Sequence, residues 1–106
     1  MISKFYIGRL VATKEVAERM DHCRAFAGFV SDCLKKYVSC DWGNMDSDDA
    51  AINNAAVKHG DERIMGAYLF PSDSKFETDV PLLDNKIWIV TECDHSVTTI
   101  LYPSEY

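Results

Sequence analysis

Apolar residues recur at helical spacing through the first part of this chain. Between Phe26 and Val38 they follow the i, i+3, i+4, i+7 pattern of a helix that buries one face. Before this helix, Thr13 is placed to accept a hydrogen bond from a free backbone N–H and so to cap a short helix over Lys14 to Met20. The pattern therefore predicts two helices in the first 40 residues.

A third predicted helix follows an interruption around Asp41-Trp42-Gly43. Asp46 or Ser47 would cap its first turn, and the helix would run to about His59. Gly60 is suited to the left-handed residue that ends many helices. These residues set the predicted start and end of the third helix.

The apolar pattern changes to that of strands elsewhere. Runs rich in β-branched and aromatic residues, bounded by turn formers, predict a first strand before Thr13 and three strands in the second half of the chain. Pro71 and Pro81 frame an interruption from Ser72 to Asp84, which we interpret as a loop before a C-terminal hairpin. The predicted strands are 4–12, 63–70, 87–90 and 97–102.

The predicted order of elements is β-α-α-α-β-β-β. This segregated order is typical of an α+β protein, with a mostly antiparallel sheet of about four strands and helices packed on one face. A length of 106 residues and 47% hydrophobic residues fit a single compact domain, residues 1–106. We expect the chain to fold as one unit.

The cellular setting is predicted from two absences in the sequence. No apolar run approaches the ~18 to 20 residues that span a bilayer, and the first residues lack the apolar core of a signal peptide. We therefore expect a cytoplasmic protein without membrane contact. The four cysteines, Cys23, Cys33, Cys40 and Cys93, form no Cys-x-x-Cys pair, so we expect reduced thiols.

Charge is unevenly distributed along the chain. Residues 1–40 carry a formal charge of +3 and residues 41–106 carry −9, which gives the net charge of −6. An acidic balance of this kind opposes non-specific binding to nucleic-acid phosphates and favours a protein partner with a basic surface. The alternative is that these charges serve only solubility.

The densest group of reactive side chains lies between the last two predicted strands, at Glu92-Cys93-Asp94-His95. A thiol beside an imidazole suggests a nucleophile with its base, and this turn supports the alternative of a small enzyme or a metal-binding protein. Neighbouring positions of one turn rarely attain that geometry, however. We therefore favour a structural turn and assign no catalytic residue.

Metal sites are not supported by residue spacing. The acids Asp41, Asp46, Asp48 and Asp49 do not fit a calcium loop, and helix capping explains them more simply. Cys33 and Cys40 are about 10 Å apart along a helix, too far to bind one zinc ion together. We expect neither a metal nor a cofactor.

Four short motifs stand out: Gly8-Arg9-Leu-Val-Ala-Thr13, Asp41-Trp42-Gly43, Trp88-Ile-Val-Thr-Glu92 with Asp94, Ser96, Thr98 and Thr99, and Tyr102-Pro-Ser-Glu-Tyr106. Together they resemble a family of small uncharacterised proteins encoded on bacterial plasmids, phages and other mobile elements. The resemblance spans nearly the whole chain. It implies an accessory cytoplasmic protein, and it carries no catalytic residue with it.

The leading hypothesis is a non-enzymatic binding protein, in the form of an inhibitor that presents a DNA-like acidic surface to the basic channel of a host defence nuclease. A homo-oligomer that pairs through an exposed sheet edge is a further alternative. Trp42 would serve either as an interface anchor or, as we favour, as part of the core. The candidate interaction surface is Asp41, Trp42, Asp46, Asp48, Asp49, Glu92, Asp94 and His95.

Overall fold

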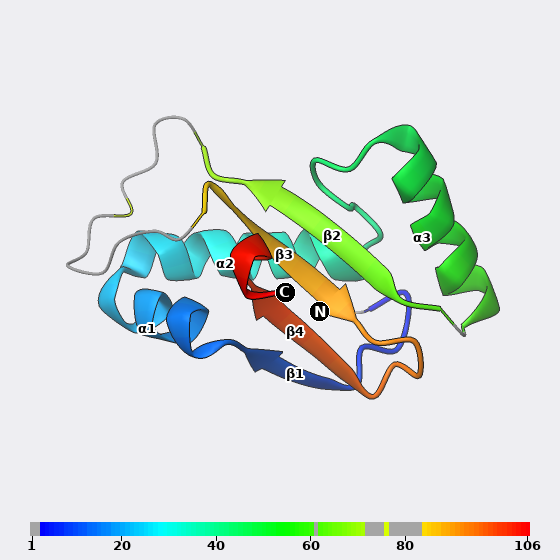
Figure 1. Ribbon diagram of the computed structural model, residues 1–106, viewed down its shortest axis with the longest axis horizontal. Helices are drawn as coiled ribbons and strands as arrows, with labels where there is room; N and C mark the ends of the chain where they lie inside the picture. Colours follow the sequence, from blue (N-terminus) through cyan, green and yellow to red (C-terminus); the bar gives the residue numbers. More distant parts are fainter. Residues whose placement is uncertain (1–2, 61, 72–75, 77–83) are drawn as a thin grey trace.

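In the part of the chain that the structure describes, four strands form one sheet, which three α-helices accompany (Figure 1). The computed structural model describes residues 3–60, 62–71, 76 and 84–106. Strand order across the sheet is β1-β4-β3-β2. The elements are β1 (Arg9–Ala12), α1 (Lys14–His22), α2 (Arg24–Val38), α3 (Ser47–His59), β2 (Ile64–Leu69), β3 (Lys86–Thr91), β4 (Val97–Leu101) and a 3₁₀ turn, η1 (Pro103–Glu105).

The predicted α+β class and the order of elements are confirmed. The sheet is mixed, because β1 runs parallel to β4 while the β2–β3 and β3–β4 pairs are antiparallel. The first strand is shorter than predicted, since residues before Arg9 approach α2 instead, where the backbone amide of Lys4 donates to the carbonyl of Val38. Most of the predicted Ser72 to Asp84 loop lies outside the described residues.

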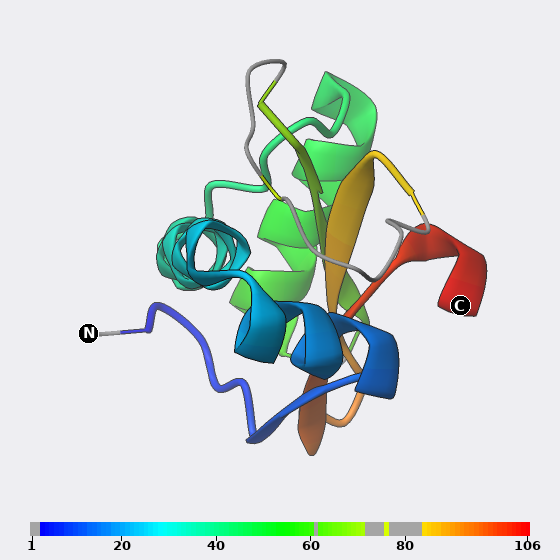
Figure 2. The same cartoon turned by 90° about the vertical axis from the view of Figure 1, so that its left-hand side faces the viewer.

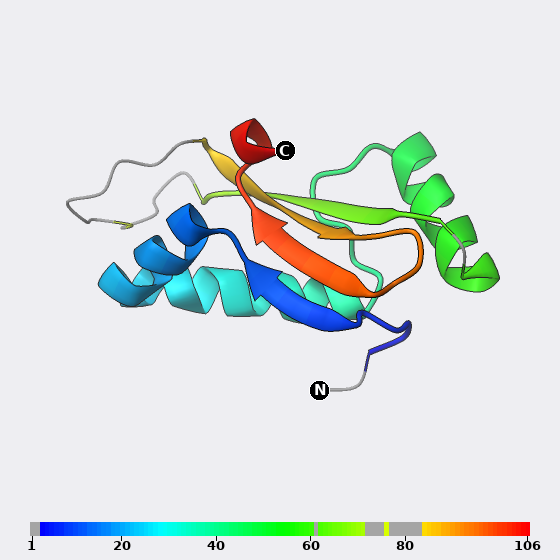
Figure 3. The ribbon, with the colours of Figure 1, turned by 60° about the horizontal axis from the view of Figure 1, so that its bottom comes forward.

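Two of the helices pack on one face of the sheet, and the third does not. Figures 2 and 3 show α1 and α2 on one side, whereas η1 lies on the other. Helix α3 stands beside the outer edge of β2 (Figure 1). The prediction of helices on one face therefore holds for α1 and α2, and α3 protects an edge. No described helix is long and apolar enough to cross a membrane.

A line of buried hydroxyl groups crosses the layer between α2 and the sheet. The hydroxyl of Tyr37 donates to the carbonyl oxygen of Ile64 and lies 2.7 Å from Oγ1 of Thr91. Thr91 in turn pairs with Thr98 across β3 and β4, and Thr98 donates to the carbonyl of Ile7. Burial raises the pKa of Tyr37, so this hydroxyl stays neutral at physiological pH.

Among the described residues, no α-helix lies over the opposite face of the sheet, where η1 is found. Trp88 projects there, and the ring of Tyr106 packs edge-on against it at 5.7 Å between centroids. The guanidinium of Arg63 lies 5.2 Å from the centroid of the Tyr106 ring. The segment after β4 therefore covers part of a face that would otherwise be open.

Candidate functional site

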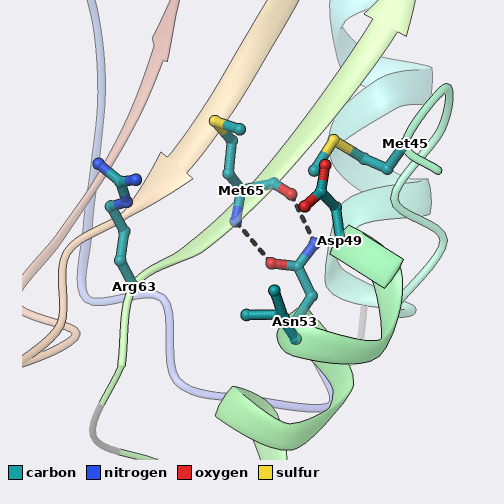
Figure 4. A pocket seen from close by; sticks show the side chains of 6 residues that line it. Met45, Asp49, Asn53, Arg63 and Met65 are labelled. Atoms are coloured by element: carbon teal, nitrogen blue, oxygen red, sulfur yellow. Dashed lines mark hydrogen bonds between the residues drawn. The ribbon is translucent and has the colours of Figure 1, made fainter. Parts of the chain in front are cut away.

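The outer edge of β2 is closed by side-chain amides, and this closure positions the candidate site. The side chain of Asn53, in α3, donates to the carbonyl of Met65 at 2.7 Å and accepts from its amide at 3.2 Å (Figure 4). One carboxamide thus makes both hydrogen bonds that a neighbouring strand would make. Helix α3 is held beside β2 by this pairing.

Three further outward-facing backbone groups of β2 are engaged by the segment between α2 and α3. The amide of Ala67 donates to the carbonyl of Trp42, and the carbonyl of Ala67 accepts from the amide of Asn44. Oδ1 of Asn44 accepts from the amide of Leu69 at 2.9 Å. The outward-facing amides of Met65, Ala67 and Leu69 and the carbonyls of Met65 and Ala67 are therefore engaged and cannot pair with a further strand.

A hollow of about 190 Å³ opens between α3 and β2. Its apolar lining comes from Met45, Ile52 and Met65, while Asn53 lies at its base. Figure 4 shows Met45 on the α3 side with its thioether extending toward β2, and the Met65 side chain rising from β2. Two flexible thioethers and one aliphatic side chain form a surface that can adapt to an apolar group of a partner.

Charges of opposite sign flank the hollow. Asp49 lines it from the first turn of α3, and Arg63 lines it from the chain just before β2. Asp46 caps α3 by accepting from the Asp49 amide at 2.8 Å, and Asp48 lies in the same turn. All three carboxylates are exposed, and none makes an ion pair with another described residue. They are available to a basic group.

The predicted acidic residues lie in two separate places. Asp41 precedes α3, where its carboxylate accepts from the amide of Gly43. Glu92 and Asp94 occupy the β3–β4 turn, which lies near the C-terminal end of α3 (Figure 1), beside the chain at Glu62. The length of α3, about 20 Å at 1.5 Å per residue, separates them from Asp46. The two groups do not form one acidic patch.

Trp42 and His95 are buried. Trp42 is 5% exposed, and its indole N–H donates to the side chain of Asn54. His95 is 7% exposed, with Nδ1 3.0 Å from the carbonyl oxygen of Tyr6 and Nε2 3.3 Å from that of Glu62. Both side chains organise the fold, and neither can contact a partner directly.

The β3–β4 turn has the geometry of a structural turn. The hydroxyl of Ser96, followed by its backbone amide, holds the pKa of Asp94 below its ordinary value. Both ring nitrogens of His95 face backbone carbonyls, so the ring cannot serve Cys93 as a base. Within the described part of the chain, no cluster of three His, Cys, Asp or Glu residues could hold a metal ion.

The thiols differ in their surroundings. Cys23 and Cys33 are buried, Cys40 is half-buried and Cys93 is exposed. Burial raises the pKa of Cys33 to about 12 and also raises that of Cys40. Cys23, Cys33 and Cys40 act as small hydrophobic residues in or beside the core.

Sequence reasoning missed the apolar lining of the hollow. Helix α3 buries Asn53 and Ala56 and leaves its largest aliphatic side chain, Ile52, 56% exposed, which is the reverse of the usual pattern. The available signal was the Asn53-Asn54 pair, because two adjacent amides in a helix suggest bonds to backbone or indole groups outside it. Met45 and Met65 carried no such signal.

No protein-family model matches the sequence, and comparisons with curated proteins and with solved structures find no match.

Proposed function

We propose that this chain is a non-enzymatic binding protein that takes a basic, partly apolar segment of a partner protein into the hollow between α3 and β2. The observation that carries the proposal is the exposure of Ile52 beside Met45 and Met65, next to the acidic first turn of α3. Exposed apolar groups gathered in a concave surface and rimmed by charge are typical of interaction sites.

Charge gives the proposed complex its orientation. A lysine or arginine of the partner would lie against Asp46, Asp48 and Asp49, and an aliphatic or aromatic side chain would enter the hollow. Arg63, on the opposite side, would attract a carboxylate or a carbonyl oxygen of the same segment. The site thus favours a segment with a basic residue at one end of an apolar anchor.

For the class of partner, we propose a nucleic-acid-binding protein, such as a host defence nuclease that the chain inhibits. The support is the charge of −9 on residues 41–106 together with the resemblance to mobile-element proteins. Because Glu92 and Asp94 lie apart from the α3 acids, the proposal rests on Asp46, Asp48 and Asp49 and not on one continuous DNA-like surface.

The test is affinity capture from lysate of the host cell, followed by mass spectrometry. The triple variant Asp48→Lys, Asp49→Lys, Ile52→Glu should lose the partner, because it reverses the charge and fills the apolar site with a carboxylate. Asp46 is left unchanged because it caps α3.

The matched control is Glu92→Lys with Asp94→Lys, which changes charge by the same sign in the β3–β4 turn, about the length of α3 away from Asp46. The control should retain the partner, and a captured nuclease should lose activity when wild-type protein is added. Equal capture by all three proteins, or equal loss in both variants, would refute the proposed site.

A further inference from the structure

The two edges of the sheet are built differently. At β2, the outward-facing amides of Met65, Ala67 and Leu69 and the carbonyls of Met65 and Ala67 are engaged by Asn53, Asn44 or the backbone around Gly43. At β1, the opposite edge, no described residue plays that part, and Figure 1 shows nothing alongside it. Among the residues that the structure describes, β1 is therefore the more open edge of the sheet.

Alternation along β1 identifies which backbone groups face outward. The amide of Arg9 donates to Ser96 and that of Thr13 donates to Ile100, so residues 9, 11 and 13 face β4. The intervening residues, Leu10 and Ala12, therefore direct their N–H and C=O groups away from the sheet. Both side chains are exposed, and Leu10 is an exposed large aliphatic residue at 43%.

We propose that β1 pairs antiparallel with β1 of a second copy of this chain, across a twofold axis at Val11. In this register Leu10 lies opposite Ala12 of the other copy, and the two pairs exchange four backbone hydrogen bonds. The result is a continuous sheet of eight strands, twice the four of one chain. The interface is separate from the hollow beside α3, which lies at the other edge.

Charge is compatible with this pairing. Arg9 is the charged residue of β1, and in the proposed register it faces Thr13 of the second copy rather than Arg9. The two arginines are four strand positions apart, about 14 Å at 3.4 Å per residue, which exceeds the Debye length of about 8 Å at physiological salt. An antiparallel arrangement therefore avoids like-charge repulsion at the axis.

The size of the interface predicts a weak and concentration-dependent dimer. A four-residue strand buries much less than the ~1,200 Å² of a standard stable interface, and Leu10 and Val11 are its main apolar contributors. We expect association to be half complete at a protein concentration on the order of 100 μM.

Analytical ultracentrifugation of the full chain from about 10 μM to 1 mM tests the proposal. The wild-type mass should rise from 12.0 kDa toward twice that value. Ala12→Pro removes an N–H that the monomer does not use, and Leu10→Lys places a charge at the edge, so both variants should remain at the monomer mass. Circular dichroism spectra would show whether each variant is folded. If the Ala12→Pro variant does not fold, the Leu10→Lys variant still tests the proposal.

The control is Ile52→Lys, which alters the hollow and leaves β1 unchanged. It should dimerise like wild type, so a failure of the proposed function and a failure of this inference are distinguishable. A wild-type protein that stays at 12.0 kDa at about 1 mM would overturn the inference. The inference would also be overturned if Leu10→Lys dimerised as tightly as wild type, or if Ile52→Lys lost the dimer.

Discussion

Replacing Asn53 by alanine removes both hydrogen bonds that close the β2 edge at Met65. Each such bond contributes about 1 kcal/mol net, and a backbone group left without a partner in a dry site costs about 1–3 kcal/mol more. Because the hollow lies alongside, water can reach Met65 once the amide is gone, so we expect the low end of that range. The free energy of unfolding should fall by about 2–3 kcal/mol, or about 10 °C in melting temperature.

Urea denaturation followed by tryptophan fluorescence measures this change. Asn54→Ala is the matched control, since it removes a single bond from the Trp42 indole and should cost about 1 kcal/mol. Asn53→Asp should lower the free energy of unfolding more at neutral pH than near pH 3, because its ionised carboxylate would face the Met65 carbonyl. If Asn53→Ala cost no more than Asn54→Ala, the carboxamide would not be what holds this edge.

The remaining predictions concern backbone strain and thiol access. Gly43→Ala should cost more than about 3 kcal/mol in urea denaturation, because its φ is +71° and the new Cβ would lie 2.2 Å from a backbone oxygen. Gly60→Ala, with φ +77° and open space around it, should cost about 1–2 kcal/mol, and equal losses at the two sites would contradict the steric reasoning. Ellman's reagent at pH 8 should modify Cys93 rapidly, and Cys33, with a pKa raised to about 12, should react only after unfolding. A Cys93→Ser variant that kept the fast phase would refute this assignment.

Local signals made the helices predictable. Thr13 accepts from the Val16 amide at the start of α1, Asp46 caps α3, and Gly60 ends α3 in the left-handed conformation, all as the sequence predicts. Each of these depends on residues within one turn of the helix end. The two strands of the β3–β4 hairpin were equally predictable, because β-branched runs flank a polar turn.

Long-range pairing was not predictable from those signals. The parallel alignment of β1 with β4 joins Arg9 to Val97, and nothing in either segment specifies the other. The hollow was missed for a related reason, since α3 directs Asn53 toward β2, where it bonds to Met65, and leaves Ile52 in solvent. Hydrophobic periodicity assigns large aliphatic residues to the core, so it cannot predict a helix that buries an asparagine and exposes an isoleucine.

The place of β4 between β1 and β3 has a consequence during synthesis of the chain. Among the described strands β1 pairs with β4 alone, and the paired positions 9 and 97 are 88 residues apart. A ribosome adding about 5–20 residues per second would leave β1 without its neighbour for about 4 to 18 s. The hairpin of β2 and β3 can form first, so the sheet is completed only when β4 is inserted between that hairpin and the waiting first strand.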